Sequence, residues 1–267
     1  MATALTIAGS DSGGGAGIQA DLKTFTVLGV YGSSVIAALT AQNTLGVRGV
    51  FSIPADFVEE QLVAVLDDIG ADAAKTGMLA NGEIIRAVAR VLRHRSLKNL
   101  VVDPVMVSKS GHSLLEPEAC DALKQDLLPL ALVVTPNLFE AQELTGRLVR
   151  NLEDMKTAAR RISEMGPRYV VVKGGHLGGP ATDLVFDGEG FTTLTHERVQ
   201  SKNTHGTGCT FSAAIAAFLA KGHPVLEAVA NAKKYVTAAI AHSLDIGKGY
   251  GPTNHLAWNH QMEVWGE

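Results

Sequence analysis

The sequence predicts an α/β fold in which a mostly parallel sheet is covered by helices on both faces. Short apolar, often β-branched runs alternate along the chain with segments whose apolar residues recur at helical spacing. Strands of a parallel sheet that is covered on both faces are apolar throughout, without polar alternation. The chain has 267 residues, of which 46% are hydrophobic, and this suffices for one large core.

The expected elements follow one another in strand–helix order. Each expected strand is a short apolar run, and each expected helix carries an apolar stripe at a spacing of three and four residues. The expected strands are residues 4–8, 34–39, 73–76, 100–103, 132–135 and 169–173. The expected helices are residues 18–28, 57–69, 83–93, 117–127, 138–145 and 152–165.

Towards the C-terminus the pattern changes to a hairpin. Residues 183–186 and 190–194 flank Asp187-Gly188-Glu189, and an Asp-Gly pair between two such runs is typical of a tight turn. We therefore expect an antiparallel edge, followed by helices over residues 211–220 and 226–244. Glycine-spaced residues 42–52 are expected to form a flap beside the site. The chain shows no linker and no repeat, which predicts one domain over residues 1–267.

Composition excludes several classes of function. The net charge is −4, the pI is about 6.1 and aromatic residues make up 5%, so nothing favours nucleic acid as a partner. The two cysteines make no disulfide framework, which predicts a reducing, cytoplasmic location. We expect no signal peptide and no membrane partner, because no apolar run reaches the roughly 18 residues of a membrane span.

Residues 204–210 carry the strongest functional signal. Gly206, Thr207 and Gly208 leave backbone amides unobstructed just before an Ala-rich segment that is typical of a buried helix. Free amides and the dipole at a helix N-terminus together favour an anion. Cys209 lies where this field is strongest, so we expect its thiol to lose its proton more easily than a free thiol. The alternative is a plain helix cap with a buried thiol.

A second glycine-dense loop, residues 9–17, follows the first expected strand. Its spacing matches neither a Walker loop nor a dinucleotide-binding loop. Glycine turns let the backbone come close to a small ligand. Asp21 lies in the first turn of the following helix, where its carboxylate could accept a hydrogen bond from a substrate hydroxyl. The alternative is a surface acid that the helix dipole favours.

Polar residues also follow the later strands, at the sheet edge where open α/β folds bind ligands. Asp103 ends one apolar strand, and Lys173 ends another, where it could provide a point charge for phosphate. Asn137 and Glu140 stand three residues apart on one helical face and could hold water around Mg²⁺. The same pair also fits a capping box, and the two interpretations are compatible.

Other candidate residues carry weaker signals. His176 and His205 lie in loops, where a lone histidine more often faces solvent than contacts a ligand. Cys120 falls within an expected helix, which favours a packing role. No spacing of cysteine and histidine resembles a zinc site.

Taken in order, these motifs resemble those of one family. The chain is similar to hydroxymethylpyrimidine/phosphomethylpyrimidine kinases of thiamine biosynthesis, members of the ribokinase-like superfamily, over residues 4–245. The matching motifs are AGSDSGGGAGIQAD (8–21), AQNT (41–44), KTGML (75–79), DPVM (103–106), KSG (109–111), TPNLFEA (135–141), KGGH (173–176) and HGTGCT (205–210).

The resemblance implies a three-layer α/β/α sandwich and an ATP-dependent kinase. The substrate would be 4-amino-5-hydroxymethyl-2-methylpyrimidine and then its monophosphate, which becomes the diphosphate. Mg²⁺ is the implied cofactor, ATP the implied phosphoryl donor and a homodimer the implied assembly. The alternative within the superfamily is a pyridoxal or pyridoxamine kinase. A non-catalytic nucleotide sensor is disfavoured by the complete set of motifs, and a dinucleotide oxidoreductase by the missing fingerprint.

The resemblance also implies a role for each candidate residue. Cys209 would be the catalytic base. The anion hole would consist of Gly206, Thr207 and Gly208. The pyrimidine would be held by Gly9, Ala16, Asp21, Gln42, Met78 and Val105. The nucleotide and the waters of Mg²⁺ would be held by Asp103, Asn137, Glu140, Lys173 and Thr207, with Asp103 and Glu140 nearest the metal.

Overall fold

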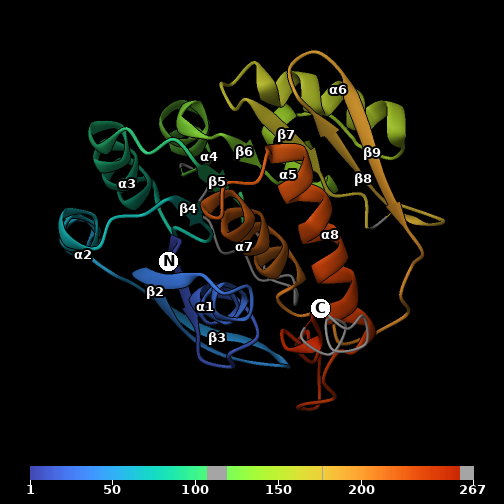
Figure 1. Ribbon diagram of the computed structural model, residues 1–267, viewed down its shortest axis with the longest axis horizontal. Coiled ribbons are helices and arrows are strands. Elements are labelled where there is room, and N and C mark those ends of the chain that lie inside the picture. The colour runs from blue at the N-terminus through green and yellow to red at the C-terminus, as the bar shows by residue number, and fades with distance from the viewer. Residues whose placement is uncertain (107–118, 176, 259–267) are drawn as a thin grey trace.

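A computed structural model of the chain describes residues 1–106, 119–175 and 177–258. Within them, nine strands form one sheet in the order β3-β2-β1-β4-β5-β6-β7-β8-β9 (Figure 1). The strands are β1 (Thr3–Asp11), β2 (Tyr31–Asn43), β3 (Gly46–Ser52), β4 (Ala73–Thr76), β5 (Leu100–Val102), β6 (Val133–Val134), β7 (Tyr169–Val172), β8 (Ala181–Phe186) and β9 (Phe191–His196).

The centre of the sheet is parallel, from β2 through β1, β4, β5 and β6 to β7. The chain passes from β1 to β2 on one side and later returns to pair β4 with the other side of β1. The loops that leave β1 and β4 therefore diverge and open a crevice at the carboxyl ends of these strands. Open α/β sheets bind their ligands at such a switch point.

Antiparallel strands form both edges of the sheet. The predicted hairpin is confirmed as β8 and β9, which pair from Ala181 with His196 to Phe186 with Phe191. The segment expected to form a flap, residues 42–52, is an antiparallel strand pair in which β2 extends to Asn43 and pairs with β3. Gly46, at a φ of 155°, allows the short connection between these strands.

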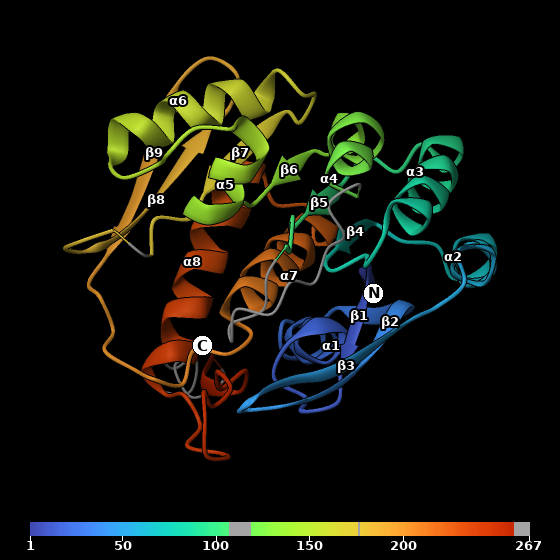
Figure 2. The ribbon, with the colours of Figure 1, turned by 180° about the vertical axis from the view of Figure 1, so that it is seen from behind.

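Helices cover both faces of the sheet, so the predicted three layers are confirmed (Figures 1 and 2). One face carries α1 (Gly17–Val27), α7 (Thr207–Ala220) and α8 (Val225–Ala241). The other face carries α2 (Ala55–Asp68), α3 (Gly82–Arg95), α4 (Ala119–Ala122), α5 (Leu138–Thr145) and α6 (Leu152–Ser163).

Alternate residues of the central strands belong to two separate cores. Val171 of β7 packs in the core beneath α7, whereas Val170 and Val172 pack on the opposite face. In β5, Val101 and Val102 are divided in the same way. Successive side chains of a strand point to opposite faces. Both faces are buried, which explains why these strands are apolar throughout.

The helix expected over residues 117–127 is broken. Its described part starts at Ala119, because residues 117 and 118 lie outside the described part of the chain. α4 ends at Ala122, and a π-helical turn (Leu123–Leu127) and a 3-10 turn containing Pro129 follow. Proline has no amide to donate and cannot continue a regular helix. Across the described ranges, no helix is long and apolar enough to cross a membrane.

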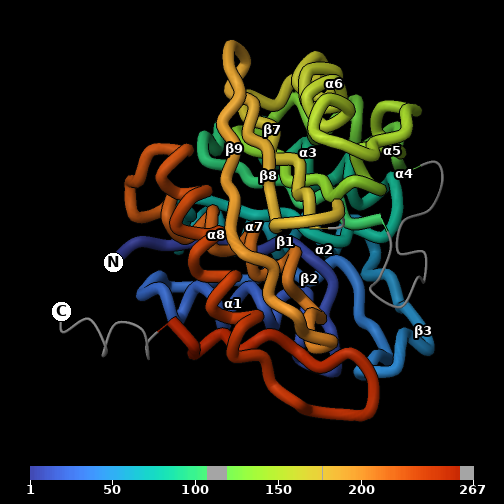
Figure 3. The backbone as a smooth tube through the Cα atoms, turned by 90° about the vertical axis from the view of Figure 1, so that its right-hand side faces the viewer, coloured from blue at the N-terminus to red at the C-terminus, as the bar shows by residue number. Residues whose placement is uncertain are grey.

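The segment after α8 returns to the loop that precedes α7 and passes the connection between β2 and β3 (Figure 3). The amide of Tyr250 donates to the carbonyl of Thr44 (2.9 Å), and the amide of His205 donates to the carbonyl of Gly251 (3.1 Å). These bonds brace the start of α7 from a part of the sequence in which no motif was recognised.

Candidate active site

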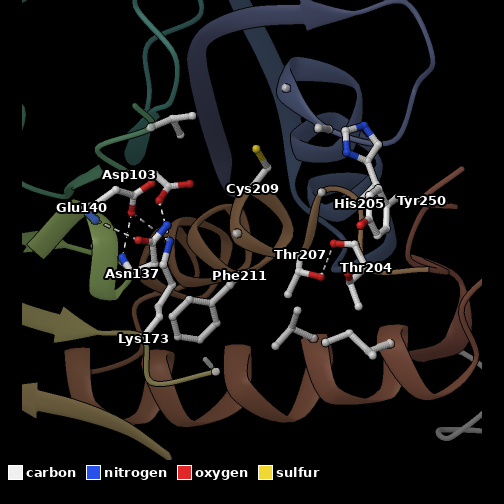
Figure 4. Close-up of a pocket in the computed structure, with 18 of the residues that line it drawn as sticks. Asp103, Asn137, Glu140, Lys173, Thr204, His205, Thr207, Cys209, Phe211 and Tyr250 are labelled. Atoms are coloured by element: carbon white, nitrogen blue, oxygen red, sulfur yellow. Dashed lines mark hydrogen bonds and ion pairs between the residues drawn. The ribbon is translucent and has the colours of Figure 1, made fainter. Parts of the chain in front are cut away.

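A cavity of about 950 Å³ opens at the carboxyl ends of the parallel strands. Its walls come from the loop after β1, the ends of β4, β5 and β6, the loop after β7, the start of α7 and one side of α8. Figure 4 shows carboxylates gathered around Lys173 at one side of the cavity, His205 at the other, and Cys209 between them. The strand ends that the sequence singled out therefore meet in one place.

Five of the six residues expected to hold the pyrimidine line this cavity: Gly9, Ala16, Gln42, Met78 and Val105. The amide of Gly9 donates to the carbonyl of Met78 (3.1 Å), and a side chain at Gly9 would come within 3.3 Å of the Met78 sulfur. Gly9 thus keeps this wall flat. The Nε2 atom of Gln42 lies 3.3 Å from Nε2 of His205, which places the Gln42 amide at the cavity surface.

Asp21, the sixth residue, lies behind the cavity wall. The sequence predicts Asp21 in the first turn of its helix. Helix α1 begins at Gly17, so Asp21 lies in the second turn. Its side chain has no exposed surface, and its carboxylate accepts hydrogen bonds from Thr6 Oγ1 (2.6 Å) and Lys75 Nζ (2.9 and 3.1 Å). Lys75 lines the cavity in its place. Asp21 is therefore not part of the cavity lining, and its bond to the substrate stays a prediction.

Helix α7 begins at Thr207, and amides at the start of a helix have no carbonyl partner within it. Of the three amides expected in the anion hole, that of Thr207 donates to the carbonyl of Thr204 (3.3 Å). Gly206 precedes the helix at a φ of 82°, and a side chain at this position would come within 1.7 Å of the Gly15 carbonyl. The loop before α7 and the glycine loop after β1 are therefore packed against each other. The Thr207 hydroxyl donates to the carbonyl of Thr204 (2.8 Å) and closes the turn before the helix.

Cys209 is the third residue of α7, and its sulfur faces the cavity (Figure 4). The expected easy ionisation of this thiol is wrong: burial raises its pKa to about 11. The ammonium of Lys75 and the amide of Gly17 lower the pKa, and the carboxylates of Asp21 and Asp103 raise it further. Loss of water around the sulfur thus outweighs the field of the helix N-terminus.

Asp11 organises the glycine loop, and the sequence motifs did not single it out as a functional residue. Its carboxylate accepts hydrogen bonds from the amides of Gly13 (2.8 Å), Gly15 (3.0 Å) and Ala16 (2.9 Å). It also lies 2.8 Å from Nε2 of His205. Burial would raise the pKa of Asp11, but the bonds from His205 and the loop amides hold it below its usual range. An aspartate followed by closely spaced glycines was the available signal for such a turn.

Asp103, Lys173 and Glu140 form a charged group at the other side of the cavity (Figure 4). Lys173 Nζ lies 2.9 Å from Asp103 Oδ1 and 3.9 Å from Glu140 Oε2. Asp103 also accepts hydrogen bonds from the hydroxyls of Thr135 (3.1 Å) and Ser212 (3.1 Å). Each carboxylate is thus held in place by the surrounding strands and helices.

Asn137 and Glu140 form the capping box that their spacing allowed. The Asn137 side chain accepts a hydrogen bond from the amide of Glu140 (2.9 Å), and the Glu140 carboxylate accepts one from the amide of Asn137 (2.7 Å). Burial raises the pKa of Glu140 to about 7; Lys173 lowers it, and Asp103 raises it further. The capping role fixes the carboxylate in the cavity, so it does not exclude a ligand role.

This charged group suits Mg²⁺ held through water. Two carboxylates face one lysine, at 2.9 Å from Asp103 and 3.9 Å from Glu140. Mg²⁺ prefers oxygen ligands and retains several waters when it bridges phosphates. Among the described residues, no cluster of three or more acidic, histidine or cysteine side chains could enclose a metal by itself. The waters and the substrate phosphates would therefore have to complete the shell.

The loop after β7 is held from two directions. The amide of Gly174 donates to Asp183 Oδ1 (2.9 Å). The guanidinium of Arg198 donates to three carbonyls of this loop, those of Gly175 (2.6 Å), Leu177 (2.5 Å) and Gly179 (2.9 Å). The loop begins directly after Lys173, so the bonds from Arg198 help to hold Lys173 in its position at the cavity.

Three features of the sequence are not part of the cavity as described above. The motif at residues 109–111 and His176 lie outside the described residues. Cys120 is half-buried against the core beside α3, as its packing role predicts.

A helix N-terminus, a lysine and carboxylates surround one space, and this arrangement suits phosphoryl transfer. The chain belongs to the phosphomethylpyrimidine kinase family, whose model matches residues 11–254.

Two relatives extend this comparison. The chain is 57% identical to the hydroxymethylpyrimidine/phosphomethylpyrimidine kinase of Rhizobium meliloti, over 96% of this chain and 97% of that protein. It is 54% identical to the thiamine biosynthesis bifunctional protein ThiED of Geobacter sulfurreducens. That alignment covers 94% of this chain but 52% of the Geobacter protein, so the chain spans about half the length of the bifunctional relative.

Solved structures of pyridoxal kinases share the fold. The ADP complex of Bacillus subtilis pyridoxal kinase has a TM-score of 0.91 at 46% identity, over 97% of this chain and 99% of that one. Staphylococcus aureus pyridoxal kinase with AMP-PCP and pyridoxal has a TM-score of 0.90 at 42% identity, over 97% and 95%. The two groups of relatives differ in their named substrates, so the fold alone does not choose between them.

Proposed function

We propose that the chain transfers the γ-phosphoryl group of ATP first to 4-amino-5-hydroxymethyl-2-methylpyrimidine and then to the resulting monophosphate. The observation that carries this proposal is the single cavity, in which the start of α7 faces the pyrimidine wall on one side and the Lys173 group on the other. The names of the most similar curated relatives support the substrate. The ADP and AMP-PCP complexes of the structural neighbours support an adenine nucleotide as the donor.

In the first step the hydroxyl oxygen of the alcohol attacks the γ-phosphorus, the bond to ADP breaks, and the hydroxyl proton passes to the thiolate form of Cys209, which becomes the thiol. The amides at Gly206, Thr207 and Gly208 would stabilise the charge that develops on the transferred group. Lys173 would add a point charge. When bound, Mg²⁺ would be held through water by Asp103 and Glu140 and would neutralise charge between the phosphates.

The second step needs less help from a base. A phosphate monoester has lost most of its second proton near neutral pH, so the attacking oxygen is already anionic. Both steps still transfer the same group and need the same cradle. Cys209 is therefore proposed to matter more for the alcohol than for the monophosphate.

A pyridoxal kinase is the second candidate, because the two solved neighbours described above are named as such at 46% and 42% identity. An ADP-release assay with the pyrimidine alcohol, its monophosphate, pyridoxal and ribose separates the candidates. We expect both pyrimidines to be turned over, with kcat/KM above that for pyridoxal. Turnover of pyridoxal alone would contradict the proposal.

The cytoplasmic location and the homodimer are also proposals. Exposed apolar side chains on the β2–β3 edge support association of two copies, among them Val50 (40% exposed) and Phe51 (66%). The mass of the chain in solution, measured by analytical ultracentrifugation, tests the dimer.

Cys209→Ala tests the assignment of the base. Its single-turnover rate with the alcohol should fall roughly 10²–10⁴-fold, the usual size for a positioned base. Its rate with the monophosphate should fall much less. Because the thiol has a pKa of about 11, the rate of the first step in the unchanged chain should rise with pH from 6 to 9, and this rise should disappear in the variant.

Cys120→Ser and Gly208→Val serve as controls for this test. Cys120→Ser removes the thiol that packs against the core and should leave both steps unchanged. A side chain at Gly208 would point towards Lys173 Nζ, 3.5 Å from its Cβ, and should slow both steps about equally. Equal loss of both steps in Cys209→Ala would mean that the cysteine supports the cradle and is not a base.

A further inference from the structure

Lys75 is a charged side chain buried in the centre of the sheet. It has no exposed surface, and its Nζ donates to both carboxylate oxygens of Asp21, at 3.1 and 2.9 Å. Burial would lower the pKa of Lys75, but the charge of Asp21 and the other anions nearby raises it, so the ammonium stays charged. Replacing a buried ion pair by apolar side chains is often neutral or stabilising. Stability alone therefore does not explain this pair.

The sheet register directs Lys75 towards the start of α7. Ala73, two residues earlier on β4, packs in the core beneath α7, and residues two apart on a strand share a face. Ser212 of α7 donates to Asp103 Oδ2 (3.1 Å), which fixes the first turns of the helix over the strand ends. Cys209 precedes Ser212 by about one turn, and both Cys209 and Lys75 line the cavity.

We infer that the Lys75 ammonium, held in place by Asp21, is the fixed positive charge that stabilises the Cys209 thiolate. Lys75 is then a positioning residue, because it acts on the reaction through the sulfur of Cys209. Its importance for catalysis rests on the proposed function, in which this sulfur accepts the proton of the alcohol. The electrostatic interaction itself needs no substrate and can be measured without one.

The charges around the Cys209 sulfur come from four elements. Lys75 on β4 and Lys173 after β7 favour the thiolate, whereas Asp21 on α1 and Asp103 after β5 oppose it. Asp103 and Lys173 form an ion pair of 2.9 Å, so their effects at the sulfur largely cancel. Burial is the largest influence on the thiol, and Lys75 is the largest of those that counteract it. Removal of the Lys75 charge should therefore raise the pKa of the Cys209 thiol more than removal of any other nearby positive charge.

The pH dependence of alkylation by iodoacetamide measures the ionisation of Cys209. The parent chain carries Cys120→Ser, which leaves Cys209 as its one thiol. Lys75→Met removes the charge with little change in length, and the alkylation rate at pH 8 should fall roughly tenfold or more. Lys75→Gln removes the charge but keeps a polar side chain, and it should lower the rate in the same way. Circular dichroism and cooperative thermal unfolding select the variants that fold.

Lys233→Met is the matched control. Lys233 is another buried lysine on the cavity wall, 7% exposed and 2.7 Å from Asp183, but it is not among the main groups that shift the pKa of the Cys209 thiol. Its removal should leave the alkylation profile unchanged. An unchanged profile in folded Lys75→Met overturns the inference, as does an equal loss of rate in the control.

Lys75→Gln keeps the inference testable if Lys75→Met does not fold, because it also removes the charge but retains a polar group beside Asp21. A slower alkylation at pH 8 then supports the inference, and an unchanged or faster one overturns it. Failure of the proposed function would be recognised separately, because the unmodified chain would then release no ADP with the pyrimidine alcohol.

Discussion

The Glu140 carboxyl should make the stability of the chain depend on pH. Its pKa is about 7 in the folded chain, mainly because of burial, against an ordinary value of 4.5 in the unfolded chain. Between these values the folded chain holds one more proton, so stability falls as pH rises through this window. At about 1.4 kcal/mol per pH unit, the loss between pH 5 and pH 8 is roughly 2 to 3 kcal/mol.

Glu140→Gln removes this dependence while its side-chain carbonyl can still accept the hydrogen bond from the Asn137 amide. Urea unfolding at pH 5, 6, 7 and 8 gives the free energy of unfolding of both chains. The variant should gain roughly 2 to 3 kcal/mol relative to the unchanged chain between pH 5 and pH 8. Glu143→Gln, at an exposed position on the same helix, should gain nothing. A difference between Glu140→Gln and the unchanged chain that stays constant with pH would refute the assigned charge balance.

Three further changes test the remaining parts of the site. Gln42→Ala should raise KM for the pyrimidine alcohol and leave KM for ATP nearly unchanged, since a polar edge of the ligand that loses its hydrogen-bond partner weakens binding. A rise in KM for ATP alone would show that Gln42 does not belong to the pyrimidine pocket. Gly206→Ala should lower the free energy of unfolding by more than about 1 kcal/mol and slow both steps, because its Cβ would meet the Gly15 carbonyl at 1.7 Å; wild-type behaviour would contradict the packed loops. Arg198→Met should raise KM for ATP roughly tenfold and not KM for the alcohol, because it frees three carbonyls of the loop after Lys173; equal shifts in both constants would refute a specific role.

Local patterns sufficed for much of the fold. Parallel strands covered on both faces leave continuous apolar runs such as that of β7, and these are visible without any tertiary information. The capping box of Asn137 and Glu140 and the helix opened by Gly206 depend on neighbours only a few residues away. The positions of strand ends then brought the candidate residues to one edge, because the carboxyl ends of parallel strands share it.

The β2–β3 edge shows where such patterns fail. Residues 42–52 contain glycines that are equally compatible with a loop, and the pairing of residues 46–52 with β2 decides their conformation. Strand pairing is a contact between segments, so the propensity of one segment does not determine it.

The electrostatics of the site were decided by the tertiary structure alone. Lys75 and Asp21 are 54 positions apart, and Asp11 and His205 are 194 apart, so no motif could pair them. The Cys209 thiol illustrates the consequence. Its place at a helix N-terminus, which the sequence contains, lowers a pKa. The loss of water around the thiol in the folded chain, which no local pattern contains, raises the pKa to about 11. Removal of water is set by every element that covers a group, and only the assembled fold contains all of them.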